Sequence, residues 1–184
     1  MNKVFYTSFH RNATTSMAYF LREIGYGNGC DHGAFHPSEP GFITMLENKD
    51  YSSMLAAADK YDYFTDSPWF LFYELLDIVY DNAKFIHCIR DPESWYRSCH
   101  KYLGGGAAPI EEYIYGRGKG DPIGNKHLWI ERFLKHHHDV MKYFNGKDNF
   151  LLLDFFGGEN REETICDFLG VEYNGTKFRH VNAS

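Results

Sequence analysis

Short apolar runs alternate with longer stretches of helical periodicity along the chain. The apolar runs predict buried strands at Val4–Phe9, Tyr61–Thr65, Lys84–Ile89 and Phe150–Phe155. Between and after them, apolar residues recur at helical spacing, which predicts helices at Thr14–Ile24, Tyr51–Lys60, Trp69–Tyr80, 92–102, Lys126–Phe144 and Arg161–Leu169. Strands that alternate with helices build a mostly parallel sheet covered on both faces. The sequence therefore predicts a three-layer α/β sandwich, as one domain over residues 1–184.

Two stretches lack this periodicity. Residues 27–41 are rich in glycine, histidine and proline, which indicates a loop. Residues 104–124 contain seven glycines together with Pro109 and Pro122, so we expect a mobile insertion or lid there. The helices that follow the second and third strands begin more sharply, because a capping aspartate stands just before a proline at Asp66-Ser67-Pro68 and at Asp91-Pro92.

The composition is that of a globular protein with an aromatic core. Hydrophobic residues make up 43% of the 184 residues and aromatic residues 18%. The formal net charge is −6, from 19 basic and 25 acidic residues, which argues against general nucleic-acid binding. The first 22 residues nevertheless hold Lys3, Arg11 and Arg22 and no acid. Such a positive island in an acidic protein suits one small anion.

We expect no signal that would direct the chain out of the cytoplasm. The N-terminus reaches His10 and Arg11 before any long apolar stretch, which argues against a secretory signal. No segment approaches the roughly 20 apolar residues that a membrane span requires. The four cysteines form neither a C-x-x-C pair nor a cluster with metal-ligand spacing. We therefore expect a cytoplasmic protein in a reducing compartment.

The first candidate site is the turn from the first strand into the first helix. Ligands of parallel α/β folds bind at the carboxyl ends of strands. A helix N-terminus there offers N–H groups and a positive dipole end to phosphate or sulfate, and Arg11 and the hydroxyls of Thr14–Ser16 add donors. The alternative is that Asn12 or Thr14 merely caps the helix. The stretch is not a Walker A motif, because it has no glycine and no lysine.

The second candidate site follows the third strand. Arg90 stands at the end of that strand, and Ser98 lies eight residues later, about two turns into the next helix. The Asp91-Pro92 turn between them lets both side chains converge on one anion. On spacing alone, an equally good interpretation is that Arg90 pairs with Asp91 or Glu93 and that Ser98 lies on the helix surface.

The segment Arg-Asp-Pro-Glu-Ser-Trp-Tyr-Arg-Ser at 90–98 resembles the 3′-phosphate-binding motif of the P-loop-fold sulfotransferases, in particular the small, largely microbial branch of that family. Those enzymes use 3′-phosphoadenosine 5′-phosphosulfate (PAPS). Thr14–Ser16 after Arg11 is similar to the family's 5′-phosphosulfate loop, and residues 178–182 resemble its closing segment. The weaker patterns Asp66-x-Pro68 and 168–171 also fit. The first loop departs from the family pattern at Asn12-Ala13, where small residues or glycine are usual.

The resemblance implies the P-loop-nucleotide-hydrolase-like fold and the transfer of a sulfonate group from PAPS to a hydroxyl or amine. It implies that Arg11 neutralises the leaving phosphate and that no metal is needed. The acceptor stays unidentified, as a small molecule or glycan. The residues implied to bind PAPS are Arg11, Asn12, Ala13, Thr14, Thr15 and Ser16 for the 5′ end, and Arg90 and Ser98 for the 3′-phosphate.

The general base is open among three residues. Histidine suits the role because its free pKa is near 6.5, and His32 and His36 lie in the loop after the first helix. Asp66 ends the second strand and faces the same edge of the sheet. The three adjacent histidines 136–138 point about 100° apart on one helix and cannot converge on one metal ion, so we expect a partly solvated helix face there.

Two other functions stay open on the sequence. One is a nucleotide kinase or other NTPase on the same fold, which the missing Walker lysine and glycines disfavour. The other is a non-catalytic relative that binds nucleotide or a partner protein, which the unusual Asn12-Ala13 pair and the open choice of base suggest.

Overall fold

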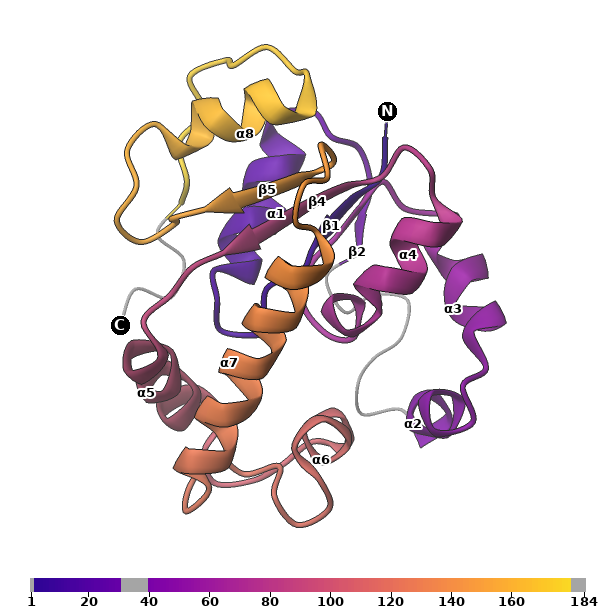
Figure 1. Cartoon of the computed structure of the whole chain (residues 1–184), viewed down its shortest axis with the longest axis vertical. Coiled ribbons are helices and arrows are strands. Elements are labelled where there is room, and N and C mark those ends of the chain that lie inside the picture. Colours follow the sequence, from indigo (N-terminus) through magenta and orange to yellow (C-terminus); the bar gives the residue numbers. More distant parts are fainter. Residues whose placement is uncertain (1, 31–39, 180–184) are drawn as a thin grey trace.

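A five-stranded parallel sheet forms the centre of the molecule. The computed structural model describes residues 2–30 and 40–179, and within them the strands lie in the order β2-β3-β1-β4-β5, with every neighbouring pair parallel (Figure 1). The strands are β1 (Val4–Tyr6), β2 (Gly29–Cys30), β3 (Tyr63–Phe64), β4 (Lys84–Cys88) and β5 (Phe150–Leu153). Their order brings the carboxyl ends of β1, β3 and β4 side by side, where the two candidate sites were predicted.

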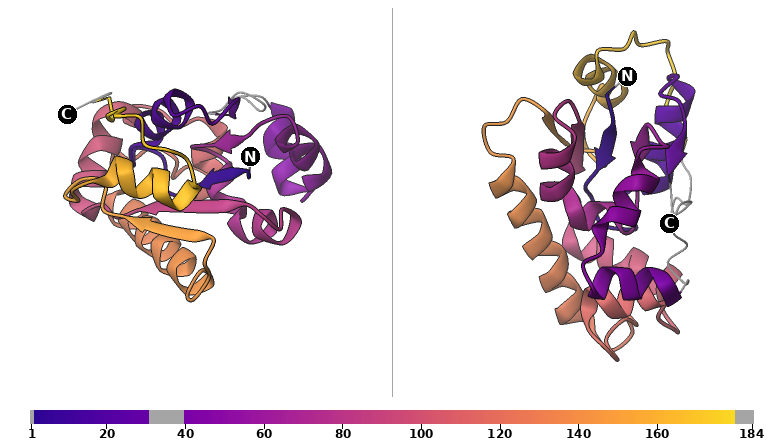
Figure 2. Two further views of the ribbon diagram at one scale, coloured as in Figure 1. Left: turned by 90° about the horizontal axis from the view of Figure 1, so that it is seen from above. Right: turned by 90° about the vertical axis from the view of Figure 1, so that its right-hand side faces the viewer.

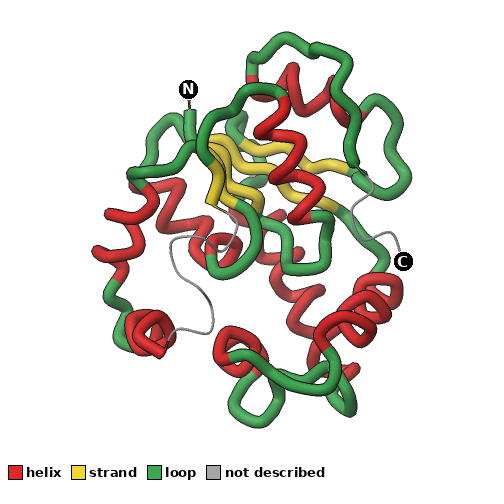
Figure 3. Tube along the Cα trace, turned by 180° about the vertical axis from the view of Figure 1, so that it is seen from behind, coloured by secondary structure: helices red, strands yellow, loops and turns green. Residues whose placement is uncertain are grey.

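Helices cover both faces of this sheet, and the predicted three-layer α/β sandwich is confirmed. Figure 2 shows α1 and α7 on opposite sides of the strands, and in Figure 3 the strands lie together between the helices. The helices are α1 (Thr14–Glu23), α2 (Pro40–Glu47), α3 (Tyr51–Ala58), α4 (Tyr73–Val79, after a 3₁₀ turn at Trp69–Phe72), α5 (Pro92–Leu103), α6 (Pro109–Tyr115), α7 (Lys126–Tyr143) and α8 (Arg161–Leu169).

The two faces of β1 explain how the layers are held together. Successive side chains of a strand point to opposite faces. Val4 and Tyr6 pack in the core beneath α1 and α8, whereas Phe5 packs in the core beneath α4 and α7. Phe5 stands opposite Phe64 on β3 and Phe85 on β4, and its ring stacks on theirs at centroid distances of 4.5 and 5.5 Å. Burying each such ring contributes about 1.5–3 kcal/mol, and the shared aromatic row fixes the register of the three central strands.

The segment 104–124 is more ordered than the sequence indicated. Pro109–Tyr115 form α6, a helix that the sequence pattern did not predict, and bury Ile110 and Tyr115. Seven residues are too few to show a clear helical periodicity, which is why the pattern missed this helix. Figures 1 and 3 place α6 at the end of the molecule opposite α8. The mobility of the segment stays a prediction.

Two smaller differences concern the ends of elements. Gly29–Cys30 form the edge strand β2 inside the stretch predicted as loop, and two residues are too short to produce an alternating pattern. The first strand ends at Tyr6 instead of Phe9, so the loop before α1 is longer than predicted. None of the helices in residues 2–30 and 40–179 combines the length and apolar character needed to cross a bilayer.

The three adjacent histidines of α7 differ in environment. His138 is exposed, as predicted for a solvated face. His136 and His137 instead meet the sheet: Nε2 of His136 donates to the Thr7 carbonyl (2.7 Å), and Nδ1 of His137 lies 3.0 Å from Nε2 of His87. Burial lowers the pKa of His136 to about 4 and holds that of His87 well below its usual value. These two imidazoles are therefore neutral at pH 7.

Candidate functional site

Side chains tether the backbone of the loop between β1 and α1 from outside. Three consecutive carbonyls, those of residues 10, 11 and 12, each accept a hydrogen bond from a side chain outside the loop. The donors are, in that order, Trp95 Nε1 (2.9 Å), a guanidinium nitrogen of Arg90, and Tyr6 Oη (2.7 Å). Because the C=O and N–H of one peptide point in opposite directions, the following N–H groups face away from these donors. Successive N–H groups in such a turn make a concavity for an anion.

The loop holds this shape at a cost in backbone energy. Arg11 and Ala13 lie in the left-handed region, with φ of 59° and 62°. Ala13 is the N-cap of α1 and has no side chain that could cap it, so the interpretation that Asn12 or Thr14 is a simple cap is wrong. Strained residues of this kind persist only where their surroundings over-determine them, and they gather at functional sites.

Replacing Ala13 by glycine should stabilise the protein. A Cβ in the left-handed region costs about 1–2 kcal/mol, and replacing alanine by glycine removes this cost. Glycine also raises the conformational entropy of the unfolded chain, which offsets about 0.5–1 kcal/mol of the stabilisation. We expect Ala13→Gly to raise the free energy of unfolding by about 0.5 kcal/mol in urea titrations. The matched control is Ala56→Gly at an exposed position inside α3, which should cost about 1 kcal/mol. Equal losses in both variants would contradict the strain at Ala13.

The hydroxyls at the start of α1 reach two different neighbours. Thr14 donates to Oδ2 of Asp66 (3.0 Å), and Ser16 donates to the carbonyl of Arg179 (3.1 Å). Asp66 follows β3 and lies in the left-handed region, with φ of 69°. The structure thus brings Asp66, one of the three residues considered as a base, against the anion loop. His32 and His36, the other two, lie outside the described residues.

Arg11 joins the two predicted anion sites. Nε of Arg11 donates to Oγ of Ser98 (3.2 Å), and its guanidinium lies 4.0 Å from the ring centre of Tyr102, one turn further along α5. Arg90 bonds the Arg11 carbonyl and Ser94, with 3.3 Å to the Ser94 carbonyl. Ser98 therefore meets Arg11 and not Arg90 in this structure, but all three residues belong to one cluster.

The alternative ion pairs of Arg90 are not formed. Oδ1 of Asp91 caps α5 by accepting from the Ser94 N–H (2.7 Å), and Glu93 pairs with Lys126 (2.8 Å). Ser98 is buried, so it is not a helix-surface serine. The interpretation of this segment as an ordinary helix start with local ion pairs is therefore wrong.

The cluster carries positive charge that the described part of the chain does not neutralise. Within residues 2–30 and 40–179, no carboxylate forms an ion pair with Arg11, Arg90 or Arg97. Burial lowers the pKa of Arg90, and the charges of Arg11 and Arg97 lower it further. Arg90 is half-buried, and its Nε has no hydrogen-bond partner. A half-buried charge without a counterion is costly, and an anion at the Arg90 guanidinium would lower that cost.

Three side chains near the cluster were not predicted as site residues from the sequence. Phe156 is 49% exposed, and the Arg90 guanidinium lies 4.6 Å from its ring centre. It follows β5 at the same edge of the sheet, so the strand-end rule could have found it. Tyr102 lies four residues after Ser98 and hence on the same helix face. Glu111 on α6 buries Oε2 without a partner, and burial raises its pKa, with Asp66 adding to the effect; no sequence signal marks it.

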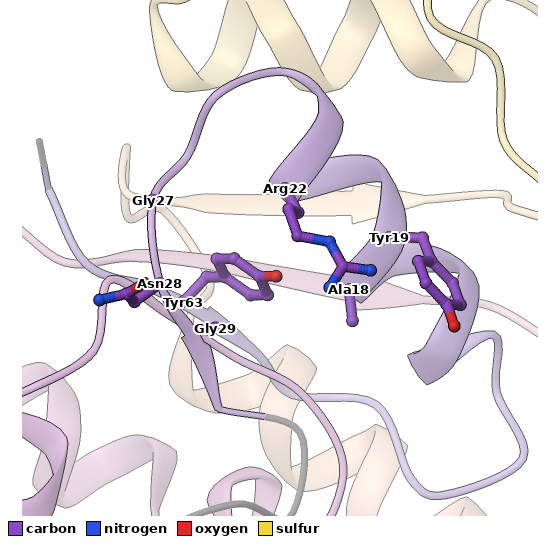
Figure 4. A pocket seen from close by; sticks show the side chains of 7 residues that line it. All are labelled: Ala18, Tyr19, Arg22, Gly27, Asn28, Gly29 and Tyr63. Carbon is purple, nitrogen blue, oxygen red and sulfur yellow. The ribbon is translucent and has the colours of Figure 1, made fainter.

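No metal centre is evident among the residues that the structure describes, because they contain no group of three or more His, Cys, Asp or Glu side chains arranged around one point. A cavity of about 290 Å³ lies elsewhere, on the β2 side of α1 (Figure 4). Its lining comprises Ala18, Tyr19, Arg22, Gly27, Asn28, Gly29 and Tyr63. None of the predicted site residues that the structure describes lines it.

Comparisons with known proteins bear on the fold and the family of the chain. A family model described as a sulfotransferase domain matches residues 3–115. Among solved structures, a sulfotransferase from Alicyclobacillus acidocaldarius superimposes with a TM-score of 0.56 at 16% identity, covering 94% of this chain and 82% of that one. The mouse sulfotransferase SULT7A1 complexed with PAP gives a TM-score of 0.51 at 16% identity, over 94% of this chain and 60% of the mouse protein. At this identity the two structures establish the fold. No curated protein sequence matches the chain.

Proposed function

The chain belongs to the sulfotransferase domain family, and from that premise we propose that it transfers a sulfonate group from PAPS to a hydroxyl or amine of a small molecule or glycan. The observation that carries the proposal is the cluster of Arg11, Arg90 and Ser98 at the tethered loop, where positive charge lacks a counterion in the described residues. A donor with phosphate groups at both ends of one nucleoside suits such a cluster.

In this proposal the two ends of the donor take different parts of the cluster. The N–H groups and hydroxyls of residues 11–16 hold the 5′-phosphosulfate at the start of α1. Arg90 and Ser98 hold the 3′-phosphate. Phe156, exposed beside Arg90, offers a ring on which adenine stacks. The mouse relative binds PAP, the desulfonated nucleotide, which supports a donor of this class.

In the proposed reaction one bond to sulfur forms and one bond to sulfur breaks. The acceptor oxygen or nitrogen attacks the sulfur of PAPS, the bond from sulfur to the bridging phosphate oxygen breaks, and PAP leaves. Arg11 neutralises the charge that develops on the leaving phosphate. Asp66 takes the proton of the acceptor, because it is the candidate base that stands against the loop. His32 and His36 remain the other candidates, and the transfer requires no metal.

Nucleotide binding tests the proposal directly. Calorimetry with PAP should give saturable binding to the wild type, and Arg90→Ala should weaken it at least tenfold, since hydrogen bonds to charged groups are worth about 1.5–3 kcal/mol. Arg97→Ala is the matched control, because Arg97 is exposed on α5 and shares only the electrostatic field of the site. It should change the affinity less than threefold. Absence of PAP binding by the wild type at millimolar concentration would sink the proposal.

A non-catalytic nucleotide-binding relative is the second candidate. The observation that favours it is the strain at Ala13, because a loop that needs glycine but lacks it can bind nucleotide and still misalign the donor. Labelled PAPS and a broad panel of hydroxyl and amine acceptors separate the two functions. Tight PAP binding without transfer to any acceptor would favour this candidate, and transfer to one acceptor would exclude it.

A further inference from the structure

His10 ties the anion loop to the segment that carries α6. Its side chain is 5% exposed, and its Nε2 lies 2.9 Å from Oη of Tyr115, the last residue of α6. Its own carbonyl accepts the Trp95 hydrogen bond that helps to tether the loop. Residue 10 is therefore held through both its backbone and its imidazole, immediately before Arg11.

Tyr115 is itself fixed by α7. Its ring is 2% exposed and stacks on Trp129 with centroids 3.7 Å apart. Nε1 of Trp129 donates to the carbonyl of Lys119 (3.1 Å), which lies in the same segment as α6. The Tyr115 hydroxyl therefore links the segment 104–124 to the loop by a direct hydrogen bond, in addition to the ring contacts of His10 with Tyr115 and Trp129.

Backbone strain in the loop makes its conformation dependent on contacts such as the hydrogen bond between His10 and Tyr115. Arg11, the next residue, sits in the left-handed region, and so does Ala13. A conformation of this kind relaxes when its surroundings no longer over-determine it. Relaxation at residue 11 would turn the Arg11 side chain away from Ser98 and would re-aim the N–H groups that follow it.

Burial lowers the pKa of His10 to about 4. The imidazole is consequently neutral at pH 7 and adds no charge to the anion site. It acts at the loop through hydrogen bonding and packing alone.

We propose that His10 is a positioning residue whose hydrogen bond to Tyr115 holds the anion loop in its binding shape and thereby couples donor binding to the state of the α6 segment. The inference rests on the proposed function, since it concerns the same donor site. By linkage, a ligand that stabilises the α6 segment in the position where this bond forms strengthens donor binding, and the donor strengthens binding of that ligand by the same factor.

Tyr115→Phe removes the bond and keeps the ring. We expect its Kd for PAP to rise about tenfold, the loss that one buried hydrogen bond gives when its partner is left unpaired. Tyr96→Phe is the matched control, because the buried Tyr96 hydroxyl donates to the Pro122 carbonyl (2.9 Å) and so reaches the same segment without touching the loop. Both variants should lose similar thermal stability, whereas only Tyr115→Phe should weaken PAP binding.

Amide hydrogen exchange gives a readout that does not depend on the nucleotide. The amide of Met17 donates to the Ala13 carbonyl (2.9 Å). In Tyr115→Phe this amide should exchange faster than in the wild type, and in Tyr96→Phe it should not. If the wild type fails to bind PAP, the proposed function fails and exchange still decides the coupling. Wild-type exchange at the Met17 amide of Tyr115→Phe would overturn the inference.

A double-mutant cycle tests whether the two residues act through one bond. His10→Phe should weaken PAP binding as Tyr115→Phe does, and the double variant should be no weaker than the worse single variant, because the second change removes nothing further. Effects of the two substitutions that multiply would show independent roles and would overturn the coupling.

Discussion

Replacing Arg11 by alanine is expected to lower the rate of sulfonate transfer about a thousandfold, the loss that follows removal of one preorganised donor or arginine from a transferring phosphoryl centre. The reason lies in the position of Arg11 between both predicted anion sites. Its backbone belongs to the loop that would hold the 5′ end of the donor, and its Nε contacts Ser98. Initial rates with labelled PAPS and an acceptor found in the panel measure the effect.

Two further variants sharpen this prediction. Arg11→Lys keeps the charge but loses the planar fork, so it should recover part of the rate. Arg97→Ala removes a charge that also lowers the pKa of Arg90, yet Arg97 is exposed, and its rate should stay within about threefold of the wild type. Full activity of Arg11→Ala would mean that another group neutralises the leaving phosphate.

The segment after β4 was predicted almost completely from its residues. The strand was expected at Lys84–Ile89 and is observed at Lys84–Cys88, and the helix was expected over 92–102 and is observed at Pro92–Leu103. Asp91 caps that helix as the Asp-Pro pair indicated. Local signals suffice here because a buried apolar run, a capping aspartate and a proline each act within a few residues.

The contact between Arg11 and Ser98 could not be predicted in the same way. It depends on a left-handed backbone at Arg11, which nothing in the residue type signals, because arginine rarely adopts it. The sequence therefore indicated two separate anion sites where the structure has one cluster. Helix α6 was missed for a related reason, since it has only seven residues and the stacking of Tyr115 on Trp129 that helps to hold it leaves no local signal.

The contact between Arg11 and Ser98 and the presence of helix α6 both depend on the same aromatic cluster. The aromatic cluster formed by α5, α6 and α7 supplies both Trp95 and Tyr115 to residue 10 of the loop. The core at this end of the molecule therefore also positions the loop that would bind the donor, because Nε1 of Trp95 and Oη of Tyr115 form hydrogen bonds with residue 10. Distant ring contacts of this kind leave no periodic trace in a sequence.

Acidification from pH 7 to pH 5 is expected to destabilise the protein by several kcal/mol, because burial keeps three imidazoles neutral in the fold. The pKa of His10 and of His136 is lowered to about 4, and that of His87 lies well below its usual value of 6.5. In the unfolded chain they titrate near 6.5. Between the two values the unfolded state binds more protons, so the free energy of unfolding falls as the pH falls. This stability is complete above pH 6.5.

Carboxylates contribute little to the change in the free energy of unfolding between pH 7 and pH 5. The hydrogen bonds of Asp77 and Glu162 hold their pKa values below the usual ones, so their contributions are lost only at lower pH. Glu111 acts in the opposite sense, because burial raises its pKa and favours the protonated form in the fold. The loss of stability between pH 7 and pH 5 therefore reports on the buried histidines.

His136→Gln isolates one of them. A shift from 6.5 to about 4 corresponds to about 2 kcal/mol between pH 7 and pH 5, so the variant should lose about 2 kcal/mol less than the wild type over that interval. Glutamine can still donate to the Thr7 carbonyl, which limits the change at pH 7 itself. His138→Gln, on the exposed face of the same helix, should leave the pH dependence unchanged. Urea unfolding at both pH values measures all three proteins, and identical pH dependence in wild type and His136→Gln would contradict a neutral, buried His136.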